Sequence, residues 1–107
     1  MKHKENEIYY SVTQLANRIN ISAKELNDIF IYIGFVRREK EYNITDYIIE
    51  DKGKKYGNQI DPDEKEGRNY YYVYYKSSIL KNPEVLDILS NYNAFRLMHN
   101  LNAYDEI

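Results

Sequence analysis

The stretch VTQLANRINISAKELNDIFIYIG, residues 12–34, has the spacing of two short helices joined by a tight turn. Apolar side chains recur three and four residues apart on both sides of the turn, which is the period of a helix face that packs against a neighbour. These apolar residues are Leu15, Ala16, Ile19, Leu26, Ile29, Phe30 and Ile33. The pattern predicts helices over 12–19 and 23–33 that face each other.

The residues at the turn favour the same prediction. Asn20 is of a type that adopts the left-handed conformation ending a helix. Ser22 and Glu25 have the spacing of a capping box, in which each side chain accepts a hydrogen bond from the other residue's backbone N–H. We therefore expect a helix-turn-helix, a motif of DNA-binding proteins that also occurs in helical domains that bind no nucleic acid.

A short hairpin is predicted directly after the second helix, over residues 35–49. Residues 35–38 (FVRR) and 42–44 (YNI) have the composition of strands, and 39–41 (EKE) that of a charged turn. A hairpin in this place is the wing of a winged helix, which contacts phosphates or a minor groove. The alternative is a solvated turn whose basic residues are neutralised by Glu39 and Glu41.

The residues expected to contact duplex DNA lie on the second helix and on the wing. Lys24 and Asn27 suit phosphates and base edges, whereas Asp28 suits DNA only where it accepts a hydrogen bond from a cytosine amino group. The full set is Ser22, Lys24, Asn27, Asp28, Tyr32, Arg37, Arg38 and Lys40. Duplex DNA is the first partner that this set predicts.

The charge of the chain argues against strong nonspecific binding to a polyanion, because the net charge is −2 and the pI about 5.7. The charge is uneven, however. Residues 1–40 carry seven basic and five acidic side chains, whereas 41–107 carry eight and twelve. The weak positive field therefore belongs to the half that holds the predicted helix-turn-helix.

Five of the thirteen tyrosines lie between residues 70 and 75, in a segment that favours a strand over 70–76. An acid-rich loop is expected before it, over 58–69. Alternation along the strand places Tyr71, Val73 and Tyr75 on one face and Tyr70, Tyr72 and Tyr74 on the other. Either both faces are covered by helices, or Tyr70, Tyr72 and Tyr74 form an interface for a protein partner.

A final helix is predicted over residues 83–101. Asn82 is a suitable N-cap, Pro83 suits the first helical position, and a broad apolar stripe follows. The stripe must pack against the chain's own core or against the same helix of a second copy, which would make a homodimer.

Several functional classes are not favoured by the composition. At 107 residues we expect one domain, 1–107, and with no cysteine there is no thiolate metal site or disulfide. The acidic residues of 61–72 lack the glycine and glutamate positions of an EF-hand, and no nucleophile and base have catalytic spacing. No signal peptide or membrane span is found. We expect a cytoplasmic protein that is not an enzyme and uses no metal or cofactor.

The succession of VTQLANRINISAKELNDIFIYIGF, a hairpin, IIEDKGKKYG and an aromatic strand resembles the carboxy-terminal winged-helix domain of many phage antirepressor proteins and related prophage regulators. The resemblance covers roughly residues 8–90, with the family's GKKYG-like segment at 53–57. It implies an α+β winged helix with an additional Tyr-rich strand and a carboxy-terminal helix. The acidic loop and the dense tyrosines depart from the family.

Two functional hypotheses follow. The first is a small winged-helix protein that binds duplex DNA as a phage or mobile-element transcriptional regulator, with the second helix in the major groove and the wing on the backbone. The alternative is a phage-encoded inhibitor of a host factor or defence system, such as an anti-CRISPR-type protein, that uses the same fold to bind a protein.

Overall fold

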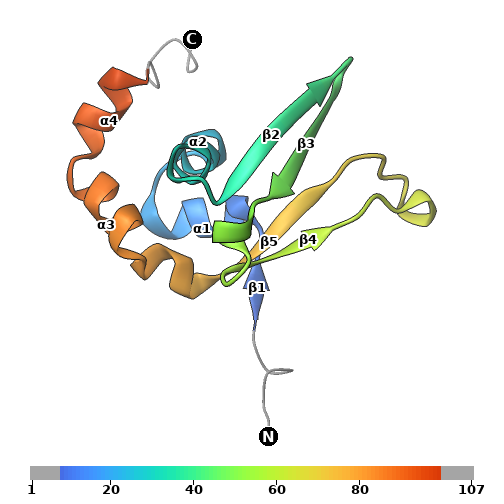
Figure 1. Ribbon diagram of the computed structural model, residues 1–107, viewed down its shortest axis with the longest axis horizontal. Helices are drawn as coiled ribbons and strands as arrows, with labels where there is room; N and C mark the ends of the chain where they lie inside the picture. The colour runs from blue at the N-terminus through green and yellow to red at the C-terminus, as the bar shows by residue number, and fades with distance from the viewer. Residues whose placement is uncertain (1–7, 100–107) are drawn as a thin grey trace, which may run out of the picture.

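The computed structural model describes residues 8–99, which form a mixed α+β fold with four α-helices and two small antiparallel sheets (Figure 1). The helices are α1 (Val12–Ile19), α2 (Ala23–Ile33), α3 (Pro83–Ser90) and α4 (Tyr92–Met98). One sheet has the strand order β1-β5-β4, from β1 (Tyr9–Tyr10), β5 (Tyr72–Lys76) and β4 (Gly57–Ile60). The other is the hairpin of β2 (Val36–Glu41) and β3 (Ile44–Ile49). The predicted α+β class is confirmed.

The two helices predicted from residues 12–34 form with the predicted bounds. Asn20 ends α1 in the left-handed region, with φ 62° and ψ 42°. The Ser22 hydroxyl accepts from the backbone N–H of Glu25 at 3.0 Å, and the Glu25 carboxylate accepts from the backbone N–H of Ser22 at 3.0 Å, so the capping box is present. A second capping box, between Ser11 and Gln14, begins α1 and was not predicted. Local hydrogen bonds therefore define both helix starts.

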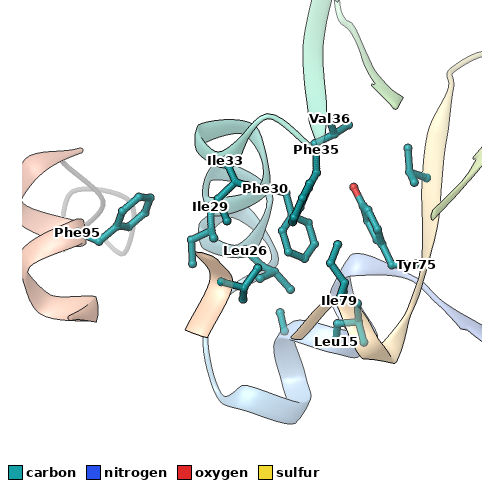
Figure 2. Close-up of a cluster of buried hydrophobic side chains, with 13 residues drawn as sticks. Leu15, Leu26, Ile29, Phe30, Ile33, Phe35, Val36, Tyr75, Ile79 and Phe95 are labelled. Carbon is teal, nitrogen blue, oxygen red and sulfur yellow. The ribbon is translucent and has the colours of Figure 1, made fainter. Parts of the chain in front are cut away.

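The core lies between α2, α1 and the β1-β5-β4 sheet (Figure 2). Of the apolar residues predicted to meet at the helix crossing, all are buried except Ile19, which is partly buried against the others. The Phe30 ring packs on Tyr75 of β5 with centroids 4.8 Å apart and on Phe35 at 6.0 Å. In Figure 2, Phe95 of α4 approaches α2 from the side opposite Phe35 and Tyr75.

The hairpin follows α2 as predicted, but its turn is elsewhere. Strand β2 continues through the charged residues 39–41, and the turn consists of Tyr42 and Asn43, with Glu41 paired to Ile44. A two-residue turn with a residue at positive φ, here Tyr42 at 58°, matches the twist of two paired strands. The expected turn at 39–41 was wrong because exposed charged residues are tolerated in a two-stranded ribbon.

Strand β4 was missed, and it shortens the expected acidic loop. Residues 58–60 belong to β4 and pair with β5 rather than entering a loop. The connection that remains holds the short 3-10 helix η3 (Glu64–Glu66). Arg68 closes it, because its guanidinium donates to the Asp61 carbonyl at 2.9 Å and to Glu66 at 3.0 Å. Strand β5 itself begins at Tyr72, two residues later than predicted.

The predicted final helix is two helices. Asn82 caps α3 and Pro83 occupies its first turn, as expected, but the helix ends at Ser90 and α4 begins at Tyr92. The Ser90 hydroxyl donates to the Leu86 carbonyl at 2.8 Å and the Asn91 amide to the Asp87 carbonyl at 3.3 Å. Such side-chain bonds compete with the helix ladder and explain the break. Residues 100 and 101 of the prediction lie outside the described residues.

The carboxamide of Gln59 joins the hairpin to the larger sheet. Its Oε1 accepts from the backbone N–H of Ile49 at 2.7 Å, and its Nε2 donates to the carbonyls of Tyr47 and Tyr72 at 2.9 and 3.0 Å. A backbone bond of 3.0 Å from Tyr47 N–H to the Tyr71 carbonyl adds to this link. The hairpin is thereby held at a defined orientation relative to β5.

We expect the replacement Ala16→Leu to lower the free energy of unfolding by about 1–3 kcal/mol, because Ala16 is 1% exposed at the crossing of α1 and α2. Denaturant unfolding followed by circular dichroism measures this. Ala94→Leu, at an exposed position of α4, is the matched control and should cost little. Equal stability of the two variants would contradict the close crossing.

Gly53→Ala should cost about 3 kcal/mol or more, because a Cβ at residue 53 would lie 2.2 Å from the carbonyl oxygen of Phe35. That oxygen cannot move freely, since it accepts from the backbone N–H of Glu50 at 2.9 Å. Gly67→Ala is the control, because a Cβ added at residue 67 would have no neighbour within 4 Å. Gly67 has φ +72°, so only about 1–2 kcal/mol of backbone strain is expected. Thermal unfolding of both variants checks the order.

Candidate functional site

Helix α2 and strand β2 lie side by side (Figure 1). We use the name α2–β2 surface for the polar side chains at this junction: Lys24 and Asp28 of α2, and Arg37, Arg38 and Lys40 of β2. Asp28 of α2 lies at its centre and bridges two cations. Its carboxylate accepts from the Arg38 guanidinium of β2 at 2.6 Å and from the Lys24 ammonium at 3.2 Å. The Arg38 guanidinium also lies over the Tyr47 ring, 5.6 Å from its centroid. The helix and the hairpin are therefore joined by one charged network.

A second network involves Arg37, which the sequence assigned to DNA. Its Nε donates to Glu39 at 2.7 Å and its Nη1 to Glu50 at 3.4 Å. These bonds to Glu39 and Glu50 raise the pKa of Arg37, which keeps its charge at any physiological pH. Lys40 is exposed on the same strand beside Glu41. Lys24, Arg37 and Arg38 are thus paired with nearby carboxylates, those of Asp28, Glu39 and Glu50.

Asn27 was expected to face outward, and this was wrong. It is 9% exposed, because the outward face of α2 runs through Lys24 and Asp28, whereas Asn27 is rotated toward β3 and β5. Ser22 remains exposed, but its hydroxyl is used by the capping box. The amphipathic pattern alone did not reveal that the hairpin and sheet cover a second side of α2.

Tyr32 is 58% exposed near the end of α2 and is flanked by α4. Its ring meets Phe95 edge-on with centroids 5.6 Å apart, and His99 at 4.9 Å. Arg96 of α4 also pairs with Glu25 at 3.1 Å. Helix α4 therefore limits the open part of α2 to the side that adjoins β2.

The tyrosines of β5 are divided between core and surface as the alternation predicted for residues 73–75. Val73 and Tyr75 are buried, and burial raises the pKa of Tyr75. On the outer face Tyr70, Tyr72 and Tyr74 form a ladder of rings, with centroids 6.1 and 5.0 Å apart. Tyr70 is exposed, whereas the other two are half-buried. Tyr71, assigned to the inner face, is instead exposed where it precedes the strand.

A pocket of about 250 Å³ lies between α1, α2, β3 and β5. Its lining consists of aromatic and aliphatic side chains together with hydroxyl and amide groups, and no charged residue: Ser11, Val12, Thr13, Asn27, Thr45, Tyr47, Tyr70, Tyr72, Val73 and Tyr75. Sequence reasoning missed this pocket, because its walls come from four elements that are far apart along the chain.

Within residues 8–99 no three His, Cys, Asp or Glu side chains come together in a way that could hold a metal ion. None of the helices in that range is long and apolar enough to cross a membrane. A search of family models, of curated proteins and of solved structures finds no match to this chain.

Proposed function

We propose that the chain binds duplex DNA through the α2–β2 surface, with α2 in the major groove and the β2–β3 hairpin acting as a wing on the backbone. The observation that carries the proposal is the Arg38–Asp28 bond of 2.6 Å, which holds the hairpin beside the open side of a capped helix-turn-helix. Helix and hairpin then meet DNA as one rigid unit. The resemblance to phage antirepressor domains supports a regulator of phage or mobile-element transcription.

The carboxylates beside Arg37 and Arg38 affect how tightly and how selectively this surface binds DNA. The ion pairs of Arg37 with Glu39 and Glu50 are exposed and therefore weak, so Arg37 can exchange these carboxylates for phosphates at little cost, whereas Arg38 stays paired with the more buried Asp28. The carboxylates remain close by and oppose a tight nonspecific interaction with the backbone. Asp28 is then placed to accept from a cytosine amino group, and Lys24 to contact a phosphate or base. We propose modest affinity in which base contacts carry much of the selectivity.

The charge network predicts that Asp28→Asn binds random duplex DNA more tightly at low salt, by about tenfold. The variant removes a negative charge from the surface and leaves Arg38 without its carboxylate partner. The slope of log affinity against log salt should steepen by about 1, since roughly one unit belongs to each phosphate contact. Fluorescence anisotropy with a labelled duplex measures both quantities.

Asp87→Asn is the matched control for this experiment. It changes the net charge by the same amount but lies exposed on α3, away from β2. Equal gains in the two variants would mean that net charge alone acts, and would contradict a contact surface at Asp28. An unmodified protein that binds no duplex at about 50 mM salt would overturn the DNA proposal.

Protein recognition is a second candidate, because a specific feature favours it. The ladder of Tyr70, Tyr72 and Tyr74 presents aromatic area with hydroxyl groups on the outer face of the sheet. Tyrosine is enriched at interfaces, since it contributes a large rigid ring at small entropic cost. In this case the helix-turn-helix is only a scaffold, and the protein acts as an inhibitor that binds a host factor. A homodimer would instead use the exposed apolar side chains of α3 and α4, which are Leu86, Leu97 and Met98.

The double change Tyr70→Ala and Tyr74→Ala should weaken a complex that uses this ladder by about 2 kcal/mol or more per ring. Tyr42→Ala is the control, because Tyr42 is 89% exposed at the hairpin tip, away from the ladder. Sedimentation first shows whether the chain associates with itself. A host protein captured by the chain is then titrated against the double variant and the control to compare their affinities. Equal affinity of the double variant and the control would exclude the ladder as the interface.

A further inference from the structure

The side chain of Asn27 is unusual among the buried polar groups. It is 9% exposed and lines the pocket between α1, α2, β3 and β5, and its carboxamide atoms are not among the buried atoms that lack a hydrogen-bond partner within residues 8–99. Buried carboxamides are normally paired. The half-buried carboxamide of Gln59, in contrast, makes three hydrogen bonds of 2.7–3.0 Å. The Asn27 carboxamide is therefore available to a polar group that enters the pocket.

The remaining lining restricts what that ligand can be. Tyr47, Tyr72 and Tyr75 contribute aromatic rings, and Thr13 and Thr45 contribute hydroxyls. No lysine, arginine, aspartate or glutamate lines the pocket, so nothing there would compensate a phosphate or an ammonium group. A volume of about 250 Å³ admits one or two fused rings but not a long chain. The ligand is neutral, flat and small.

The carboxamide of asparagine presents a donor and an acceptor side by side. The chemical group that matches this edge and also stacks on tyrosine is a heterocycle with an amino group next to a ring nitrogen, as in adenine. We propose that the pocket binds a purine base or nucleoside of the adenine type, with the base against the tyrosine rings of the lining and its amino edge paired to Asn27. This inference is independent of DNA binding at the α2–β2 surface.

Titration with adenine and with adenosine tests the proposal on the whole chain. The side-chain amide resonances of Asn27 in a ¹H–¹⁵N spectrum should shift in a saturable way. Tyrosine fluorescence, in a chain without tryptophan, should change with the same midpoint. Purine, which lacks the 6-amino group, should bind at least tenfold more weakly. Equal binding of purine and adenine, or no shift at Asn27 up to the solubility limit, would overturn the proposal.

Two variants locate the site. Asn27→Leu keeps the branched shape of the side chain and removes the amide, so it should fold and lose adenine binding at least tenfold. Asn17→Leu, an exposed position on α1, is the matched control and should bind as the unmodified chain does. Thr45→Val changes another residue of the pocket wall and serves as a second test if Asn27→Leu does not fold. We expect this variant to bind adenine more weakly than the unmodified chain. Unchanged affinity in the folded pocket variants would overturn the proposal.

Discussion

The three hydrogen bonds of the Gln59 carboxamide are the constraint on which the arrangement of this protein depends. They link Ile49 and Tyr47 of one sheet to Tyr72 of the other, beside the single backbone bond from Tyr47 to Tyr71. A half-buried amide with three partners in place has a narrow range of orientations. The hairpin is therefore fixed relative to β5, and through Arg38 and Asp28 relative to α2 as well.

Helix α2 has three different environments around its circumference. Leu26, Ile29 and Phe30 face the core, Asn27 faces the pocket, and Asp28 faces the hairpin and solvent. Neighbouring residues of a helix are about 100° apart, so consecutive side chains reach different surroundings. The helix thus supports the core, one wall of the pocket and the centre of the charged surface together.

The pocket and the α2–β2 surface meet at Tyr47. Its ring lines the pocket on one side and lies under the Arg38 guanidinium on the other. Its backbone is held by the Gln59 amide and by the Tyr71 carbonyl. The two surfaces are therefore built on the same rigid strand, β3. The tyrosine ladder continues from the pocket along the outer face of β5 through Tyr72.

The sequence by itself determined the local features: the bounds of α1 and α2, the turn at Asn20, the capping box at Ser22 and the start of α3 at Asn82. Each depends on hydrogen bonds or packing between residues a few positions apart, which spacing reveals. Tertiary structure decided the inward position of Asn27, the pairing of Asp28 with Arg38, the existence of β4 and the pocket. These depend on contacts between distant segments, whose orientation follows from how β3, β4 and β5 pack rather than from any local pattern.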